Sequence, residues 1–354
     1  MDIYDNREFD GHELVIFGHD AATGLKAIIA INSTALGPAA GGCRMWPYAT
    51  TADALTDVLR LSRGMSYKNA MAGLPFGGGK AVIIGDARAT KTPELFAAFG
   101  RMVDALRGRY VTAEDVGTTT ADMAHVSRVT RYVSGLGRSA GQAAGGDPAP
   151  KTALGVFLGL RAAVKFRLGR SDLEGLTVVV QGVGGVGYHL CGMLATAGAR
   201  LKVADVVATS VERACDEFGA TSIPPVQVLE EEADVLAPCA LGAILNARSI
   251  ARLRVPVIAG AANNQLARNE DGEALRAAGI LYAPDYVINA GGIISVAREY
   301  YGGTEGQVIE DIQGIPARLT EIFERARREN RPTSEVADAI ARERLRLEAP
   351  RLVA

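Results

Sequence analysis

Two lysines in the first quarter of the chain have sequence neighbours that suggest a role in a catalytic or binding site. Lys68 lies in RGMSYKNAMAG, and Lys80 follows three glycines and precedes the apolar run AVII. A lysine in this setting is expected to be desolvated, and the glycines would let a substrate approach the backbone closely. A desolvated amine beside a second cation would be partly neutral near neutral pH and able to act as a general base. The alternative is two ordinary surface lysines.

An acidic side chain could complete this chemistry. Asp115 lies in TAEDVGTT, where a β-rich run enters a glycine-containing loop. Loops of this kind often carry catalytic groups, and a carboxylate there could exchange a proton with an amine. The alternative is an aspartate that only stabilises a turn.

A glycine-rich segment further along the chain has the pattern of a dinucleotide-binding turn. In TVVVQGVGGVGYHL, an apolar strand precedes Gly182, Gly184 and Gly187, and a helical pattern follows. In this order, the first glycine permits the tight turn, the second admits the pyrophosphate, and the third packs helix on strand. The helix N-terminus then attracts the anion. Gly185 and Val186 complete the predicted turn.

Asp205 ends the next predicted strand, LKVAD, about 20 residues further on, where an acidic residue hydrogen-bonds the adenosine ribose. A carboxylate there repels a 2′-phosphate. The sequence therefore predicts NAD as the cofactor, in preference to NADP.

The elements that would position these residues indicate an α/β fold with two lobes. A hairpin is expected at Glu13–Phe17 and Leu25–Asn32, and then helices at Thr51–Met65 and Thr92–Arg107. From about residue 152, helices alternate with short apolar strands, as in a doubly wound parallel sheet. The final stretch, Ile309–Leu347, has a helical pattern.

The expected domain boundaries follow from a segment of small residues at 138–150, which we interpret as a linker. Residues 1–137 would form the substrate, catalytic and oligomerisation domain, and residues 138–327 a Rossmann NAD-binding domain. A C-terminal helix at about 328–354 is expected to pack back on the first domain.

Composition argues against several other classes of protein. The 354 residues carry 38 basic and 40 acidic side chains without a basic patch, so neither nucleic acid nor a membrane surface is an expected partner. The four cysteines and four histidines are scattered, and no metal site is expected. Without a leader or a long apolar run, the protein is expected in the cytoplasm.

Together these segments resemble the glutamate/leucine/phenylalanine/valine dehydrogenase family, and most of all its leucine and valine branch. The resemblance is carried over nearly the whole chain by LGPAAGGCRMWPY, LRLSRGMSYKNAMAGLPFGGGKAVIIGD, GRYVTAEDVGTTTADM, QGVGGVGYHLC, AGAANNQL and YAPDYVINAGGIISVAREY. It implies reversible oxidative deamination of an amino acid to a 2-oxo acid and ammonia, and a homo-oligomer.

The resemblance also implies roles for individual residues. Lys68 would pair with the substrate α-carboxylate, Lys80 would activate water, and Asp115 would exchange a proton with the amino nitrogen. The remaining implied positions fall into two groups. Substrate-binding residues would be Gly41, Gly42, Met65, Ala40, Ala113, Ile293 and Val296. Residues on the nicotinamide half of the cofactor would be Thr152, Ala261, Asn263 and Asn289.

The expected substrate has an apolar side chain. Glutamate-specific relatives carry a lysine at the position of Ala40, and a buried carboxylate without such a partner is costly. Leucine-type relatives commonly carry a leucine there, so the pocket could also accept phenylalanine or another bulky aromatic side chain. Lys151, in GDPAPK, is a further departure from the family pattern and lies next to Thr152.

Two rival interpretations are weaker. A hydroxy-acid dehydrogenase would need an acid–base histidine, and none of the four lies in a glycine-rich site. A catalytically silent NAD-sensing protein would not need both lysines and the aspartate.

Overall fold

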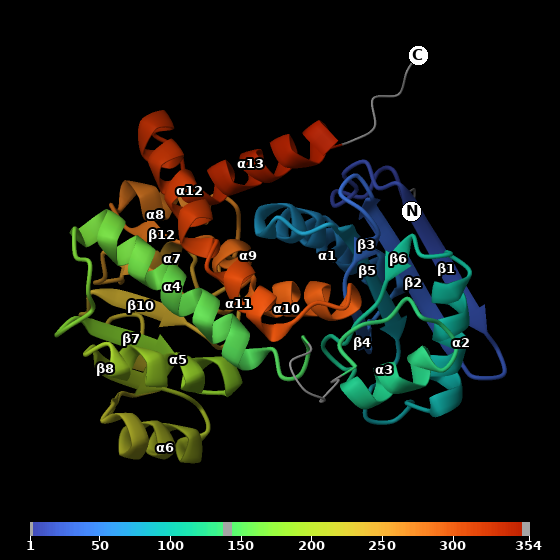
Figure 1. Ribbon diagram of the computed structural model, residues 1–354, viewed down its shortest axis with the longest axis horizontal. Helices are drawn as coiled ribbons and strands as arrows, with labels where there is room; N and C mark the ends of the chain where they lie inside the picture. The colour runs from blue at the N-terminus through green and yellow to red at the C-terminus, as the bar shows by residue number, and fades with distance from the viewer. Residues whose placement is uncertain (1–2, 137–143, 349–354) are drawn as a thin grey trace. The chain divides into compact units, whose positions relative to one another are not determined.

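The computed structural model describes residues 3–136 and 144–348, which form two compact units (Figure 1). The first unit comprises Met1–Gly146, Val296–Glu305 and Ala341–Ala354, and the second comprises Asp147–Ser295 and Gly306–Ile340. Each unit has its own sheet with helices packed on it, which confirms the α/β class with two lobes. Of the expected linker at 138–150, residues 138–143 lie outside the described part of the chain.

The sheet of the first unit is mixed and has the strand order β1-β2-β5-β3-β6, with β4 also paired to β5. The expected hairpin is present, because β1 and β2 pair antiparallel. The strands are β1 (Leu14–Asp20), β2 (Leu25–Ser33), β3 (Ala39–Ala40), β4 (Cys43–Trp46), β5 (Gly77–Ile84) and β6 (Tyr110–Val111).

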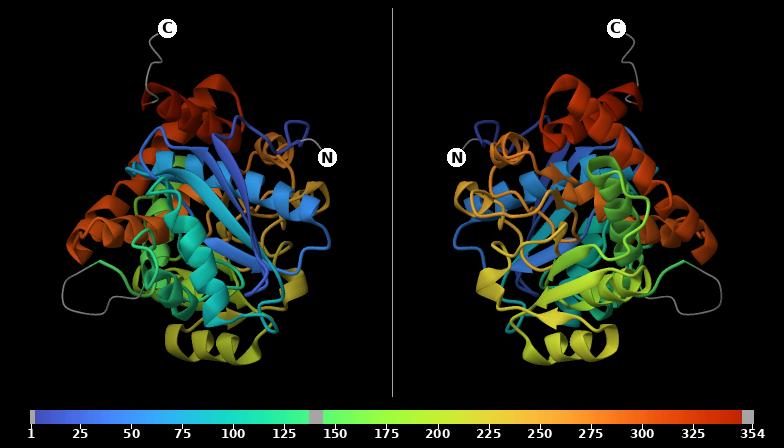
Figure 2. Two further views of the ribbon diagram at one scale, coloured as in Figure 1. Left: turned by 90° about the vertical axis from the view of Figure 1, so that its right-hand side faces the viewer. Right: turned by 90° about the vertical axis from the view of Figure 1, so that its left-hand side faces the viewer.

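Both faces of this sheet are buried, because alternate residues of β2 and β5 enter different cores. Ile28 and Val82 pack with α1 (Thr51–Ala72), whereas Ile29 and Ile83 pack with α2 (Pro93–Asp104). The short helix α3 (Thr120–Ser127) lies on α2. Figure 1 and the left view of Figure 2 show these helices with the sheet. A sheet buried on both faces gives β5 a rigid and dry environment.

Helix α1 is longer than the expected Thr51–Met65, because its second half packs closely on β5. Thr50 and Asp53 form a capping box at its start, and Gly73, at φ 70°, ends it in the left-handed conformation. Near its end, the buried Asn69 side chain donates a hydrogen bond to the carbonyl oxygen of Gly77. Lys68 therefore lies on a helix.

The second unit contains a six-stranded parallel sheet of order β12-β11-β10-β7-β8-β9. With the strands numbered one to six from β7, this is the order 3-2-1-4-5-6 of the Rossmann fold. The strands are β7 (Thr177–Gln181), β8 (Arg200–Ala204), β9 (Thr221–Ser222), β10 (Val235–Pro238), β11 (Val257–Ile258) and β12 (Leu281–Tyr282). Ligands of such sheets bind where the order reverses, here between β7 and β10.

Helices connect and cover this sheet. The first three are α4 (Ala149–Leu168), α5 (Gly185–Thr196) and α6 (Ala208–Phe218), and α5 packs against both of the others. The shorter helices are η1 (Pro225–Gln227), α7 (Ala247–Ile250), α8 (Asp271–Ala277), α9 (Asp285–Ile288) and α10 (Gly291–Tyr300).

The expected continuous helical stretch at Ile309–Leu347 is three helices, α11 (Glu305–Ile312), α12 (Ile315–Glu329) and α13 (Thr333–Glu348). One break falls at Gly314, before Pro316, and the other at Asn330, which has φ 52° and precedes Pro332 by two residues. Proline cannot continue a helix, and a left-handed residue ends one. No helix in residues 3–136 and 144–348 is long and apolar enough to cross a membrane.

Candidate active site

Lys80 and Asp115, which the sequence predicted as partners in catalysis, form an ion pair in the first unit. The Nζ atom of Lys80 lies 2.9 Å from Oδ1 of Asp115. Lys80 is only 5% exposed, on the buried strand β5, and Asp115 is partly buried. The predicted proximity of Lys68 to Lys80 stays a prediction. The pair brings a lysine amine and a carboxylate into direct contact.

The loop that carries Asp115 is fixed along β4. The Cys43 amide donates to the carbonyl oxygen of Ala113 at 2.8 Å. The hydroxyl of Thr118 accepts from the Asp115 amide at 2.9 Å, and it donates to the carbonyl oxygen of Cys43 at 2.8 Å. Gly117 has φ 82°, and a Cβ there would lie 2.0 Å from the carbonyl oxygen of Met45. The loop is therefore closely packed, and the Asp115 backbone is held on both sides.

The glycines around Lys80 have a packing role that differs from our expectation. A Cβ on Gly78 would lie 2.1 Å from the backbone nitrogen of Ser66, and one on Gly77 would lie 2.0 Å from the carbonyl oxygen of Ser33. These contacts are within the protein. The glycines let α1 and β2 approach β5 closely, which buries Lys80.

Gly41, Gly42 and Met65 lie together beside this pair. A Cβ on Gly41 would be 3.1 Å from Cγ of Met65, and one on Gly42 would be 2.9 Å from Cβ of Asp115. The carbonyl oxygen of Gly41 accepts a hydrogen bond of 2.6 Å from the buried Tyr110 hydroxyl. Lys68 lies three residues after Met65 on α1, which puts both side chains on one side of the helix.

The remaining predicted wall residues lie on three elements. Ala40 is buried on β3, and Ala113 is partly buried in the loop before Asp115. Ile293 and Val296 lie in α10, where the chain passes from the second unit to the first. Their arrangement around a substrate stays a prediction.

Sequence reasoning missed two charged residues that join this site. Arg44 Nε lies 3.0 Å from Oδ2 of Asp115, and its Nη1 lies 2.9 Å from Oδ2 of Asp57. Asp57 also accepts hydrogen bonds from Tyr48 and Arg60. For Arg44, the one signal in the sequence was its place just after the two glycines of LGPAAGGCR. Asp57 gave no signal, because it looks like an ordinary polar residue on the outer side of a helix.

Electrostatics favour the charged form of both aspartates. Burial raises the pKa of Asp115, but the charges of Lys80 and Arg44 outweigh it and hold that pKa below its ordinary value. For Asp57, burial likewise raises the pKa, and hydrogen bonds from Tyr48 and Arg60, with the charge of Arg44, lower it overall. Asp115 is thus an ionised carboxylate in a mostly buried setting.

The glycine-rich turn of the second unit lies at the predicted position, between β7 and α5. Gly182 has φ 91°, and a Cβ there would lie 2.7 Å from Cβ of Ala240, just after β10. A Cβ on Gly187 would lie 1.9 Å from the carbonyl oxygen of Gly182, so α5 packs directly on the turn. Gly184, at the α5 N-cap, has no neighbour within 4 Å of such a Cβ. The space in front of Gly184 is open to a ligand.

Asp205 lies at the end of β8 and anchors this turn. Its Oδ2 accepts a hydrogen bond of 2.8 Å from the Val183 amide, and its Oδ1 accepts one of 2.9 Å from the Val207 amide. Each oxygen keeps a further acceptor site. A cavity of about 360 Å³ opens here, lined by Val183, Gly184, Gly185, Tyr188, His189, Ser210 and Arg213.

The predicted nicotinamide residues also gather in the second unit. Asn289 donates from Nδ2 to Oδ1 of Asn263 at 2.8 Å and to the carbonyl oxygen of Ala261 at 2.9 Å. Its own Oδ1 is buried without a hydrogen-bond partner, and such an atom points to an unfilled polar interaction. Thr152 lies on α4, where its Oγ1 would be 3.0 Å from a Cβ on Gly292. These features fit a bound dinucleotide.

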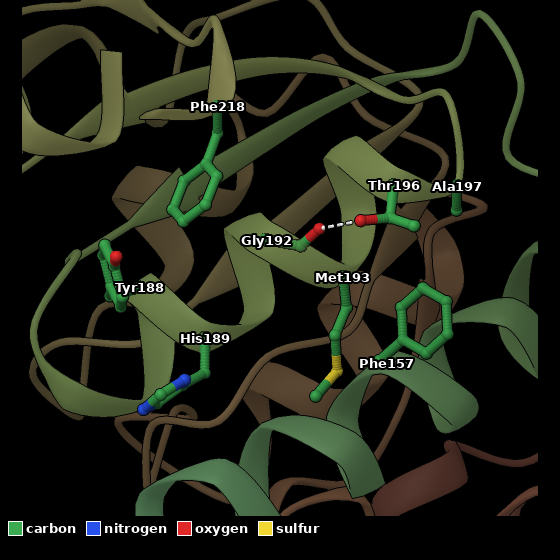
Figure 3. A pocket seen from close by; sticks show the side chains of 8 residues that line it. All are labelled: Phe157, Tyr188, His189, Gly192, Met193, Thr196, Ala197 and Phe218. Carbon is green, nitrogen blue, oxygen red and sulfur yellow. Dashed lines mark hydrogen bonds between the residues drawn. The ribbon is translucent and has the colours of Figure 1, made fainter. Parts of the chain in front are cut away.

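A second hollow of the same unit, of about 520 Å³, has different chemistry (Figure 3). Its lining is mostly apolar and comes from α4, α5 and the end of α6: Phe157, Tyr188, His189, Gly192, Met193, Thr196, Ala197 and Phe218. It contains none of the residues predicted to bind substrate or cofactor. We therefore assign no part of the candidate site to it.

Comparisons with known proteins give a consistent result. Residues 12–132 match the family described as "Glu/Leu/Phe/Val dehydrogenase, dimerisation domain", and residues 201–344 match "Glutamate/Leucine/Phenylalanine/Valine dehydrogenase". A leucine dehydrogenase of Geobacillus stearothermophilus is 49% identical over 98% of this chain and 94% of its own length. A phenylalanine dehydrogenase of Thermoactinomyces intermedius is 44% identical over 98% of this chain and 94% of its own length.

Solved structures agree with these sequence matches. The crystal structure of L-tryptophan dehydrogenase from Nostoc punctiforme has a TM-score of 0.86 and 44% identity, over 96% of this chain and 97% of that one. A hetero-hexameric glutamate dehydrogenase of Thermus thermophilus, at 24% identity and a TM-score of 0.76, shares the fold; the match covers 96% of this chain and 89% of that one.

Proposed function

The chain belongs to the glutamate/leucine/phenylalanine/valine dehydrogenase family and is an NAD-dependent amino-acid dehydrogenase, and we propose that it oxidatively deaminates an apolar L-amino acid, with leucine or valine preferred. The observation that carries this proposal is the ion pair of Lys80 and Asp115 beside Gly41 and Gly42. An ammonium and an ionised carboxylate in one partly desolvated site supply the proton transfers that deamination needs.

In the proposed reaction, each charged residue has one task. Lys68 binds the substrate α-carboxylate, and this fixes Cα and the amino group. Asp115 takes a proton from the substrate amine, Lys80 activates the water that attacks the imino carbon, and ammonia leaves to give the 2-oxo acid. NAD, when bound, accepts the hydride from Cα. The remaining contribution of the protein is orientation and exclusion of water.

The cofactor would be held by the second unit. The pyrophosphate would bind at the turn formed by Gly182, Gly184, Gly185, Val186 and Gly187, where the free N–H groups of α5 begin. Asp205 would hydrogen-bond the adenosine ribose, and its charge would oppose a 2′-phosphate. Asn289, Asn263, Ala261 and Thr152 would lie along the nicotinamide half. The buried, unpartnered Oδ1 of Asn289 supports this assignment.

The proposed preference for an apolar side chain depends on Ala40. This residue is 3% exposed, and its short side chain supplies no positive charge for a second carboxylate. Glutamate is therefore expected to be a poor substrate. The small size of Ala40, together with the similarity to phenylalanine and tryptophan dehydrogenases, supports a second candidate substrate class, the bulky aromatic amino acids.

The test is NADH formation from L-leucine, L-valine, L-phenylalanine, L-tryptophan and L-glutamate, with NADP substituted for NAD in a parallel series. We expect kcat/KM to be highest for leucine or valine with NAD. A highest value for phenylalanine or tryptophan would select the second candidate. A highest value for glutamate, or equal values for the two cofactors, would contradict the roles of Ala40 or Asp205.

We also propose that the protein is a homo-oligomer, since its first unit matches a family model described as a dimerisation domain. The outer edge of β1 lies at the end of its sheet and could pair between subunits. Sedimentation of the purified protein as a monomer would contradict this proposal.

A further inference from the structure

The contacts of Asp115 raise the question of what holds its carboxylate in place. One oxygen contacts Lys80, and the other contacts Nε of Arg44 at 3.0 Å. Arg44 lies on β4, next to β5, and its side chain is 21% exposed. A guanidinium is planar and always charged, so its orientation decides the orientation of the carboxylate that it binds. Arg44 acts on the site through Asp115.

Arg44 is in turn anchored by a third element, the helix α1. Its Nη1 lies 2.9 Å from Oδ2 of Asp57, a carboxylate whose side chain is 17% exposed. The same Asp57 oxygen accepts a hydrogen bond of 2.7 Å from Tyr48, and the other oxygen lies 2.9 Å from Arg60. With these bonds, Asp57 has little freedom to turn. The two nitrogens of Arg44 therefore bridge a fixed carboxylate on a helix and the carboxylate of the candidate site.

We propose that Arg44 is a positioning residue, which Asp57 anchors and which in turn orients the Asp115 carboxylate and keeps it ionised. This inference rests on the proposed function, because Asp115 is the group that exchanges a proton with the amine. It adds two residues to the site, which neither touch the substrate in this account nor supply a proton. Their effect is on the orientation and the charge state of Asp115.

The charge state follows from the groups that surround Asp115. Lys80 on β5 and Arg44 on β4 are its positive neighbours, and the thiol of Cys43 and the hydroxyl of Tyr110 are neutral groups near it. Burial raises the pKa of Cys43 far above its ordinary value, so this thiol adds no negative charge. Removal of the Arg44 charge would leave Asp115 with one positive neighbour fewer, and the pKa of Asp115 would rise.

The decisive experiment compares Arg44→Met, Arg44→Lys and Asp57→Asn in the full chain. We expect Arg44→Met to shift the acidic limb of the pH profile of kcat/KM upward by about one pH unit. Arg44→Lys keeps a positive charge, so the acidic limb of the pH profile should stay near its original position. A lysine cannot bridge two carboxylates, so the orientation of Asp115 should be lost and kcat should fall. Asp57→Asn should lower kcat without an upward shift, because the Arg44 charge remains beside Asp115.

A matched control is Arg63→Met. Arg63 lies on α1, its side chain is 27% exposed, and its ion-pair partner is Glu8, whose Oε2 lies 2.9 Å from Nη2 of Arg63. We expect this variant to keep the original pH profile. Thermal unfolding of every variant separates loss of folding from loss of positioning. An Arg44→Met enzyme that stays folded with an unshifted acidic limb would overturn the proposal, as would an Asp57→Asn enzyme with an unchanged kcat.

A second readout does not depend on turnover. The pKa of the Asp115 carboxyl can be measured by carbon NMR in the substrate-free protein, with Asp115→Asn to assign its signal. We expect a higher pKa in Arg44→Met than in the original chain and in Arg63→Met. An equal pKa in all three would reject the role of Arg44 even if deamination is confirmed. A raised pKa in a protein that turns over no amino acid would instead reject the proposed function alone.

Discussion

The proposed proton chemistry depends on single residues, and among the charged residues Lys80, Asp115, Arg44 and Asp57, Lys80 has the least exposed side chain. Replacement of Lys80 by Ala removes the amine that would activate water, and it leaves the Asp115 carboxylate partly buried without its Lys80 partner. We expect kcat for deamination to fall by about 100-fold or more, the scale of a lost general base. NAD binding, measured by fluorescence titration, should persist.

The control for this substitution is Lys91→Ala. Lys91 also forms an ion pair with an aspartate in the first unit, at 2.5 Å from Asp122, but it lies outside the candidate site. We expect kcat to stay within about twofold, since partly exposed ion pairs contribute little. A Lys80→Ala enzyme within threefold of the original rate would show that the assigned mechanism is wrong.

Which site residues could be predicted from the sequence depended on their local setting. Lys80 and Asp115 were predicted because each has an unusual sequence neighbourhood, and the structure joins them. Arg44 and Asp57 were missed because their meaning arises only when β4 and α1 meet. The periodicity of apolar residues cannot reveal such a contact. It indicates which side of a helix or strand is buried, but not which distant side chain lies against that side.

At the scale of elements, the glycine turn between β7 and α5 permits a sharp comparison of two substitutions. Gly187→Ala would place a Cβ 1.9 Å from the carbonyl oxygen of Gly182, so α5 must move away from the turn. We expect the free energy of unfolding to fall by about 1–3 kcal/mol. Gly184→Ala adds a methyl group to open space, so the free energy of unfolding should change by less than ~0.5 kcal/mol.

Cofactor binding is expected to distinguish the two variants in a different way from stability. Gly184→Ala places its methyl group where the pyrophosphate is expected to approach, and the NAD dissociation constant should rise by about tenfold or more. Urea unfolding and NAD titration of both proteins measure these effects. Unchanged NAD binding in Gly184→Ala would contradict the position of the pyrophosphate.

The helices and strands themselves were largely predictable, and the exceptions have physical causes. The hairpin, the strands of the second unit and the glycine turn follow local patterns. The predicted end of α1 was wrong because SYKNAMA has no strong apolar periodicity. Its small polar residues find partners on neighbouring strands, Ser66 on β2 and Asn69 on β5. The final helices were expected as one stretch because the breaks, at residues 313–314 and 330–332, are short interruptions of a helical pattern.

For the whole molecule, one buried histidine links folding to pH. His12 is 8% exposed, and its Nε2 lies 3.0 Å from the carbonyl oxygen of Leu59. Burial lowers its pKa from the ordinary 6.5 and outweighs the hydrogen bond to Leu59, which raises it. Because the folded pKa is lower than the unfolded one, the neutral ring favours folding above pH 6.5. This contribution is lost as the pH falls toward and through the folded value.

We therefore expect the free energy of unfolding to decrease between pH 7.5 and pH 5.5 more in the original chain than in His12→Gln, as measured by urea unfolding in matched buffers. The exposed His19 offers a control, and His19→Gln should keep the pH dependence of the original chain. Equal pH dependence in all three proteins would assign the acid sensitivity to other groups.

The two units are not consecutive stretches of chain, and this has a consequence for how the protein is made. Val296–Glu305 and residues from Ala341 onward return to the first unit, where Arg342 donates a hydrogen bond of 2.6 Å to Tyr67 on α1. During synthesis on the ribosome, more than 270 residues must be added after Tyr67 before its contact with Arg342 can form. Most of the second unit is synthesised in that interval. The nascent N-terminal portion therefore lacks its contact with Arg342 during most of translation.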